Sequence, residues 1–346
     1  MRNGFLILSA FFLVSCGGAG IMENVPVRVV SAEKEVSANA DTSLLAQFTE
    51  VGNCLDIQIV NDTILVLMDQ VSDMDNYHFK AYSTNSSEYL GSFLQYGRGP
   101  GEMISPRFAS ASSSERYLTI KENAAGRAFS VDVESSIRTN RTVTVEQVDL
   151  PEDVLDWFPL PDSEGFVLQL ENRRLLYRKL GRDGAAVWSV SPYNGIDAVR
   201  CMPHLSSVLV LNGETGMIAE VMLFLPQVNI FDTADSTIRS VAVDKDYRQW
   251  RSLTGKMLGP ETVQYYVCAA ASPDFIFAAY RNAQLADLSK GSDMSIHIFD
   301  WSGRFLCDLK VSENIVAMAY DTLNSCLYAI EQTAHHIVRY NLNGLL

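Results

Sequence analysis

The chain lacks the concentrations of positive charge that nucleic-acid-binding proteins carry. No long run of Lys or Arg occurs, and the formal net charge of the 346 residues is −14. Nucleic-acid phosphates and anionic lipid head groups are both recognised by clustered cations. A general affinity of the whole chain for either is therefore not expected, and no nucleic-acid partner is predicted.

Local catalytic motifs are absent as well. There is no Gly-x-Ser-x-Gly string, and no Gly-Lys-Ser/Thr follows the one Gly-rich stretch, so neither serine-hydrolase chemistry nor a phosphate-cradling loop is supported. The five His are scattered along the chain. No cofactor and no metal ligand are predicted from these residues.

Cysteine is sparse, with six residues and no Cys-x-x-C pair. Five of them follow the N-terminal region, and an odd number leaves at least one thiol unpaired. Most lie inside apolar, strand-like runs, which predicts small buried core residues, while a disulfide among them stays open. These are Cys54, Cys201, Cys268, Cys307 and Cys326.

The first residues indicate export. A short cationic start is followed by an apolar run over residues 4–14, which has the length of a signal peptide and is too short to span a bilayer. The run ends in Leu13, Val14, Ser15 and Cys16, which resembles the bacterial lipobox. That resemblance implies cleavage after residue 15 and a lipid-modified Cys16. An ordinary secretory signal with an incidental Cys is the alternative.

Residues 16–39 show no strand alternation and are rich in Gly, Ser, Ala and Glu. We expect a flexible tether here, between the lipid and a folded domain over residues 40–346. The expected location is the bacterial cell envelope, with a lipid anchor, most simply in the outer membrane. Whether the domain faces the periplasm or the cell surface stays open.

The folded part consists of short apolar runs that are separated by Asn, Asp, Gly, Ser or Pro. Residues 296–306 show the unit best: an alternating strand, a turn through Asp300 and Gly303, and a second strand. Related hairpins recur about every 45 to 55 residues, the length of a propeller blade. This predicts an all-β fold, a six-bladed β-propeller with four-stranded antiparallel blades.

Two β-sandwich domains or a β-helix are the rival folds. Closure of a propeller ring predicts that a strand near one terminus completes a sheet of the other, and residues 43–51 are the expected strand. Residues 247–259 depart from the strand pattern and are expected to form a short helix or an inserted loop.

The most unusual local string follows an apolar run near residue 94 and consists of Gly97, Arg98, Gly99, Pro100, Gly101 and Glu102. It resembles a Gly-x-Gly-Pro-Gly-Glu element of bacterial lipoproteins with six-bladed propellers related to TolB and NHL-repeat propellers. The resemblance extends over residues 40–346 and implies a fold and a location, but no reaction. Physically, Gly and Pro suit a tight crossing between blades, and Arg98 and Glu102 are expected to pair or to hold loops, with a ligand contact as the alternative.

Two functions remain for such a molecule. The first is a lipid-anchored binding or scaffolding module for an envelope protein, a peptide or a glycan, acting through loops on one face of the ring. The alternative is a calcium-dependent hydrolase or lactonase in the central channel, as in propellers of the lactonase type. Oxygen ligands near strand ends are available for it, namely Glu50, Asn53, Asp56, Asn123, Asp156, Asn212 and Asp321.

Overall fold

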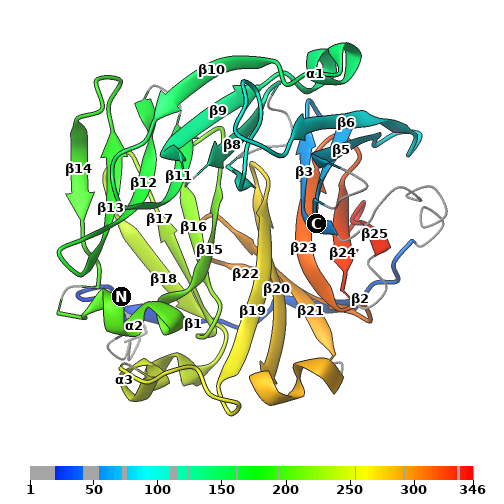
Figure 1. Ribbon diagram of the computed structural model, residues 1–346. Helices are drawn as coiled ribbons and strands as arrows, with labels where there is room; N and C mark the ends of the chain where they lie inside the picture. The colour runs from blue at the N-terminus through cyan, green and yellow to red at the C-terminus, as the bar shows by residue number, and fades with distance from the viewer. Residues whose placement is uncertain are drawn as a thin grey trace, which may run out of the picture.

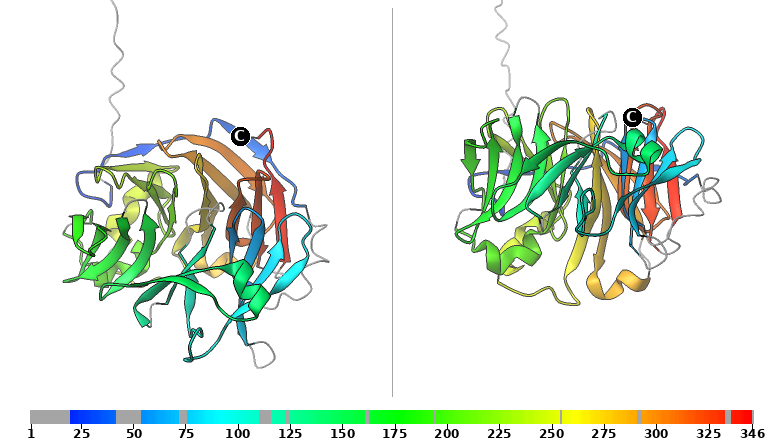
Figure 2. Two further views of the ribbon diagram at one scale, coloured as in Figure 1. Left: turned by 90° about the horizontal axis from the view of Figure 1, so that it is seen from above. Right: turned by 45° about the horizontal axis from the view of Figure 1, so that its top comes forward.

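The computed structural model describes residues 20–41, 54–71, 76–109, 116–122, 125–160, 163–193, 195–253, 255–290, 293–332 and 336–345. Six β-sheets stand side by side in a ring around a central axis (Figure 1, Figure 2). This is the six-bladed β-propeller that the hairpin repeat predicts. Cys16 and the expected closing strand 43–51 lie outside the described residues.

The first three blades each contain four antiparallel strands. Blade 1 is formed by β3 (Cys54–Val60), β4 (Ile64–Asp69), β5 (Tyr77–Ser83) and β6 (Tyr89–Gln95). Blade 2 is formed by β7 (Pro106–Phe108), β8 (Leu118–Glu122), β9 (Arg127–Val131) and β10 (Thr144–Asp149). Blade 3 is formed by β11 (Val154–Leu160), β12 (Ser163–Glu171), β13 (Arg174–Leu180) and β14 (Ala186–Val190).

The remaining blades follow in chain order. Blade 4 contains β15 (Ser207–Leu211), β16 (Ile218–Met222), β17 (Gln227–Phe231) and β18 (Ile238–Ala242). Blade 5 contains β19 (Val263–Ala271), β20 (Phe275–Gln284), β21 (Met294–Asp300) and β22 (Phe305–Val311). Blade 6 contains β23 (Ile315–Asp321), β24 (Cys326–Glu331) and β25 (His336–Asn341).

Burial on both faces explains the continuous apolar runs of the middle strands. All residues of β4, β16 and β17 are buried, because each sheet packs between two neighbouring sheets. Blades 6 and 1 share such a core, in which Ile57 and Leu65 pack with Ala317 and Tyr328. The five described thiols are buried and free, which confirms their role as small core residues.

Short helices lie between strands. Within the residues that the structure describes, they are α1 (Val133–Thr139), α2 (Ala198–Leu205), two 3-10 helices (Lys245–Gln249 and Leu285–Lys290) and α3 (Trp250–Leu253). The helix or loop expected over 247–259 is confirmed, whereas α1 and α2 were not foreseen. Asp132 and Asp197 cap these two helices by accepting hydrogen bonds from the backbone N–H groups of Ser135 and Arg200. None of the helices described is long and apolar enough to cross a bilayer.

The tether predicted over residues 16–39 is wrong for the described part of that segment. Residues 20–41 form an N-terminal belt along the outer edges of three blades (Figure 2). Strand β1 (Val27–Val29) pairs in parallel with β18, and β2 (Lys34–Ser37) pairs in parallel with β22. The folded part therefore begins before residue 40, and blades 4 and 5 have five strands instead of the four expected.

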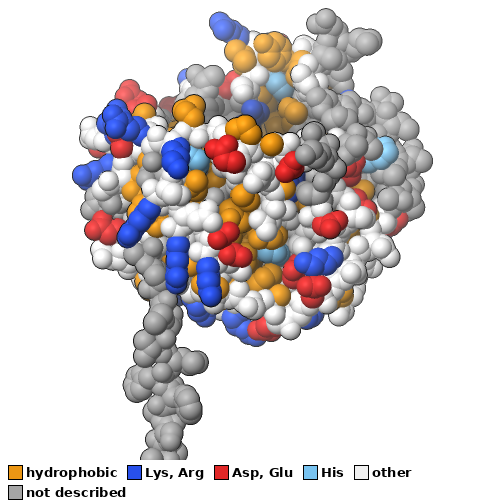
Figure 3. Space-filling view, turned by 90° about the horizontal axis from the view of Figure 1, so that it is seen from below, with side chains coloured by type: hydrophobic (Ala, Val, Ile, Leu, Met, Phe, Trp, Pro, Cys, Tyr) orange, Lys and Arg blue, Asp and Glu red, His pale blue; other side chains and the backbone are white. Residues whose placement is uncertain are grey.

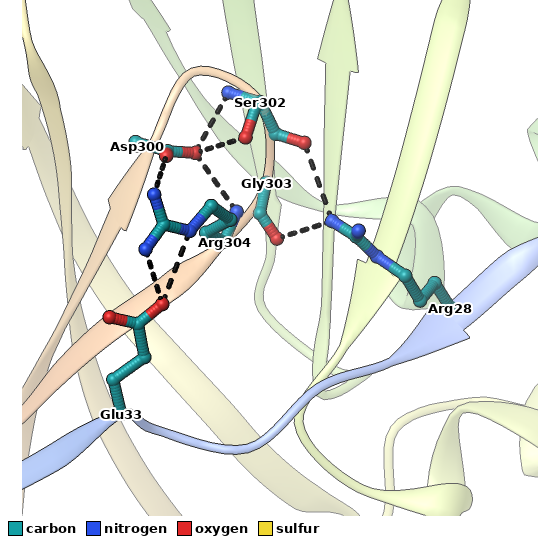
Figure 4. A network of polar contacts seen from close by, with 6 residues as sticks. All are labelled: Arg28, Glu33, Asp300, Ser302, Gly303 and Arg304. Carbon is teal, nitrogen blue, oxygen red and sulfur yellow. Dashed lines mark hydrogen bonds and ion pairs between the residues drawn. The ribbon is translucent and has the colours of Figure 1, made fainter.

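Side chains also fasten the belt to the turn between β21 and β22 (Figure 4). Arg28 Nη2 donates to the carbonyl oxygen of Gly303 over 2.9 Å, and Arg304 Nη2 donates to Glu33 Oε1 over 2.6 Å. Asp300 Oδ1 shapes the turn by accepting the backbone N–H of Arg304. The predicted hairpin over 296–306 is thus confirmed, and its turn also serves as a docking point.

The belt ends on blade 6. Asp41 forms an antiparallel bridge with Arg339 of β25, and its Oδ2 lies 2.6 Å from Arg339 Nη2. The N-terminal part of the chain therefore contacts the outer edge of the last blade.

Candidate functional site

A cavity of about 570 Å³ runs along the ring axis. Its lining comes mainly from the first strand of every blade, that is from β3, β7, β11, β15, β19 and β23. The second strand of blade 2 adds one side chain, Lys121. A pocket of this volume is large enough for a small organic ligand.

The two sides of this channel differ in chemistry. Blades 4 to 6 contribute residues 207–211, 267–271 and 316–320, which are apolar apart from Ser207 and the Tyr320 hydroxyl. Blades 1 to 3 also contribute apolar residues, but they supply all the charged side chains of the lining, namely Asp56, Arg107, Lys121 and Asp156. The channel therefore presents a charged wall opposite an apolar wall.

Lys121 and Asp156 form an ion pair across the blade 2 and blade 3 boundary. The Lys121 side chain is only 7% exposed, because β8 is buried along its whole length, so its charge requires a partner. Asp156 supplies it and also accepts the backbone N–H of Trp157 over 2.9 Å. Burial nevertheless raises the pKa of Asp156, and the Lys121 charge opposes that shift.

Asp56 differs from Asp156 because no Lys or Arg of the described chain lies within ion-pair distance of it. Its Oδ1 accepts the backbone N–H of Ile57 over 2.9 Å. Burial raises its pKa to about 6, and the charge of Arg107 acts against this rise. Asp56 is thus a carboxyl group that faces the channel and changes its charge close to neutral pH.

Arg107 is exposed, and its Nη1 donates to the carbonyl oxygen of Pro106 over 3.1 Å. Within the described residues, it has no carboxylate at ion-pair distance either. In the charged wall, Lys121 and Asp156 are therefore paired with each other. Asp56 and Arg107 carry opposite charges and keep hydrogen-bonding capacity for the channel.

Comparisons with known proteins agree with this architecture. The profile of the TolB-like 6-blade propeller-like family matches residues 34–321. The chain belongs to this family. The search of curated proteins gave no match.

Two solved structures resemble this TolB-like propeller. A member of the DUF4221 family from Bacteroides vulgatus has a TM-score of 0.57 and 10% sequence identity, with 90% of this chain and 97% of that chain covered. A Bacteroides fragilis protein designated as exported has a TM-score of 0.53 and 12% identity, with 89% and 99% covered. At such low identity these likenesses establish the fold.

The carboxylates and amides proposed as calcium ligands do not converge in the described part of the TolB-like propeller. Asp56 and Asp156 face the channel. Asn212 donates instead to the carbonyl oxygen of Pro273, and Asp321 accepts the backbone N–H of Asn324. The other three, Glu50, Asn53 and Asn123, lie outside the described residues. The described residues contain no group of three His, Cys, Asp or Glu side chains placed to hold a metal ion.

The Gly-rich motif forms the crossing from blade 1 to blade 2. Glu102 Oε2 accepts the backbone N–H of Gly99 over 2.7 Å, and the N–H of Gly97 donates to the Met103 carbonyl oxygen over 3.1 Å. A Cβ atom at Gly97 would lie 2.0 Å from Glu102 Oε2, so this position needs glycine. Glu102 therefore holds its own loop instead of pairing with Arg98.

The motif also lines a second cavity of about 580 Å³, together with Glu122, Arg127 and Gln147. The exposed Arg98 borders it, and Pro100 and Gly101 complete the loop around it. The Gly99 N–H already donates to the Glu102 carboxylate of the same loop. The geometry therefore supports a structural function of the motif.

Sequence reasoning singled out Asp56 and Asp156, but missed Arg107 and Lys121. Lys121 did leave a signal, since a cation inside the apolar run of β8 requires a partner. Arg107 gave none, because an exposed Arg next to a Pro is ordinary. Only the ring brings these four residues together.

Proposed function

We propose that this protein is an exported, lipid-anchored binding module whose ligand enters the central channel. The observation that carries the proposal is the channel's division into a charged wall and an apolar wall. A ligand that matches it has an apolar body and both a cationic and an anionic group. Of an envelope protein, a peptide and a glycan, a short apolar peptide has this chemistry.

The expected contacts involve Asp56 and Arg107, the two charged groups of the wall that have no ion-pair partner among the described residues. The peptide ammonium group pairs with Asp56, and its carboxylate pairs with Arg107. The apolar side chains lie along β15, β19 and β23, where burial of apolar surface contributes about 25 cal/mol per Å². The Lys121–Asp156 pair keeps its internal partner and holds the wall in shape.

The channel hypothesis can be tested with the dipeptide Leu-Leu as a probe, measured by isothermal titration and by thermal unfolding. At a concentration of about 100 times its dissociation constant, the dipeptide should stabilise the folded state by about 2.7 kcal/mol. N-acetyl-Leu-Leu lacks the ammonium group and should bind at least tenfold more weakly.

Asp56→Asn should remove the preference for the free ammonium group, and Arg107→Gln should weaken binding of the carboxylate end. Asp149→Asn is the matched control, because this carboxylate is 82% exposed and lies on the outer strand of blade 2. Equal binding by wild type and Asp56→Asn would refute the channel as the site.

The export and anchoring part of the proposal is supported by the signal-peptide pattern, by the lipobox resemblance and by the exported structural neighbour. Cys16→Ser should abolish incorporation of radiolabelled palmitate and should move the protein from the membrane fraction to the soluble fraction. Membrane association that persists in this variant would refute the anchor.

A further inference from the structure

The belt shortens the distance between the proposed lipid and the folded ring. Ile21 and Met22 are buried, with exposed fractions of 4% and 2%, in the core that blades 3 and 4 share with α2. Cys16 is only five residues before Ile21 in the sequence. Even a fully extended chain spans at most about 3.6 Å per residue, so the lipid-bearing residue lies within about 18 Å of this core. This reach rests on the lipid anchor proposed above.

Such a short connection restricts which part of the ring can face the bilayer. A tether over residues 16–39 would have left the propeller free to rotate. With the belt packed along three blades, the side of the ring near Ile21 stays close to the membrane. That side carries α2, α3 and the adjoining 3-10 helix (Figure 1).

The distribution of charge favours the same side. Residues 154–262, which contain blades 3 and 4 and these helices, hold 11 Lys and Arg and 13 Asp and Glu. The rest of the chain holds 16 and 28, so it carries −12 of the net charge of −14. A strongly acidic surface is repelled by anionic lipid head groups, whereas a nearly neutral sector with exposed cations is much less so. In Figure 3, Lys and Arg side chains gather on the side of the ring that carries α2 and α3.

Exposed apolar side chains lie among these cations. Met257 is 84% exposed and Val199 is 45% exposed. The Arg251 guanidinium lies 5.3 Å from the ring centre of Trp250. His204 Nε2 lies 3.0 Å from the Lys256 carbonyl oxygen, which joins the segment before Met257 to α2. We call this region the α2–α3 corner; its exposed side chains include Val199, Arg200, Arg248, Arg251, Lys256 and Met257.

Acidic residues are also present at the corner: Asp244 and Glu261 are exposed, whereas Asp197 and Asp246 have internal partners. Asp197 lies within ion-pair distance of both Arg173 and Arg200, and Asp246 Oδ2 accepts the Tyr265 hydroxyl over 3.1 Å. Apolar, Trp and cationic side chains on one surface are typical of segments that lie in the membrane interface.

We infer that the α2–α3 corner lies against the bilayer surface, with Met257 and Val199 in the head-group region and the surrounding Arg and Lys at the lipid phosphates. The ring is thereby held edge-on near the membrane, and the strongly acidic blade 1 and its neighbour blade 6, on the opposite side of the ring, point away from it. The lipid supplies the attachment, and the corner sets the orientation.

The test uses the full, lipidated chain with one environment-sensitive fluorophore, attached at Met257→Cys or at the control position Leu323→Cys. Leu323 is 62% exposed in the turn between β23 and β24 of blade 6. The five described native thiols are buried, which favours labelling at the introduced residue. The protein is reconstituted into vesicles of phosphatidylcholine and phosphatidylglycerol at a ratio of about 7:3.

We expect the label at 257 to brighten at least twofold and to lose at least half of its quenching by iodide, relative to the unlipidated Cys16→Ser form. The label at 323 should remain unchanged. Arg248→Glu combined with Arg251→Glu should return the 257 label to the behaviour of the unlipidated form, while the lipidated protein still floats with the vesicles.

The outcomes separate this inference from the anchor itself. Palmitate incorporation and flotation report the anchor, and the labels report the orientation. Absence of palmitate and of flotation refutes the anchor and, with it, the orientation. Flotation with equal quenching of both labels overturns the orientation alone. Protection of the 257 label in native envelopes but not in protein-free vesicles assigns the corner to a protein partner and also overturns the inference.

Discussion

Removal of the Glu220 side chain should destabilise the boundary between blades 3 and 4. Glu220 lies in β16, is 1% exposed, and accepts four hydrogen bonds. Its Oε1 accepts the hydroxyls of Tyr177 over 2.5 Å and of Ser207 over 3.1 Å. Its Oε2 accepts the Tyr193 hydroxyl over 2.8 Å and the Asn229 side-chain amide over 2.9 Å. One carboxylate thus joins two blades.

Glu220→Ala leaves four donors without an acceptor: those of Tyr177, Tyr193 and Asn229 are buried, and that of Ser207 is half-buried. Each stranded donor costs about 1–3 kcal/mol, and water that enters the new space recovers part of this. Relief of the buried charge offsets a further part, so we expect a net loss of about 3–5 kcal/mol in the free energy of unfolding.

Glu220→Gln should change the free energy of unfolding by no more than about 1 kcal/mol. With the Gln amide nitrogen at the position of Oε1, both neighbours are hydroxyls and can accept from it. The remaining oxygen still accepts from Tyr193 and Asn229. The two variants therefore separate the hydrogen bonds of this site from its charge.

The same pair of proteins predicts a pH dependence. Burial raises the pKa of Glu220 above its ordinary value of 4.5, so the folded state holds the proton more tightly than the unfolded chain does. The Glu220 contribution is therefore fully present below pH 4.5 and is lost as pH rises through the folded pKa. Glu220→Gln removes this pH dependence. Its free energy of unfolding should therefore rise relative to that of the wild type as pH increases.

Urea unfolding followed by circular dichroism at several pH values measures these differences. Glu146→Ala on the exposed strand β10 is the matched control and should change stability by less than about 0.5 kcal/mol. The reasoning would be refuted if Glu220→Gln lost as much stability as Glu220→Ala, because the hydrogen bonds would then not be the dominant contribution.

Four further predictions follow from the structure. Gly97→Ala should lower the free energy of unfolding by about 1–3 kcal/mol more than Gly126→Ala does. Both residues have positive φ, but only a Cβ at position 97 would lie against Glu102. Equal shifts of the melting temperature in the two variants would contradict this. Deletion of residues 20–41 should lower the melting temperature of the whole ring, because it exposes the edges of β18, β22 and β25, and an unchanged melting temperature would show that the belt is dispensable. Leu-Leu affinity should fall as pH drops below about 6, because protonation removes the charge of Asp56, and the fall should be absent in Asp56→Asn when measured by titration calorimetry. EDTA treatment followed by addition of calcium should leave the melting temperature unchanged, whereas an ion-specific rise would support the channel hydrolase.

The sequence by itself determined the local units of the fold. The hairpin over 296–306 is encoded by alternation and by a turn in which Asp300 binds the backbone and Gly303 has φ of +81°. The recurrence of such units predicted six blades. An isolated blade cannot bury both of its faces, so the blades were expected to pack side by side in a ring. The Gly-rich crossing after β6 was also visible, since close approach of Glu102 to the backbone of Gly97 requires glycine.

The belt could not be read from the sequence. Strands β1 and β2 have only three and four residues, and most of their side chains are exposed, so an alternation as short as Val27, Arg28 and Val29 does not stand out. Their stability comes from hydrogen bonds to strand edges that lie more than 200 residues away in the chain. Backbone pairing of this kind leaves almost no trace in side-chain composition.

The channel also depended on the tertiary structure. Asp56, Arg107, Lys121 and Asp156 come from three different blades, and apart from Lys121 each is an ordinary charged residue in its local sequence. Closure of the ring places them along one axis and withdraws the two carboxyl groups from bulk water, which raises the pKa of both. Sequence determined which residues form strands and turns, whereas the partners and the dielectric environment of the charged side chains were decided only when six sheets closed around a common channel.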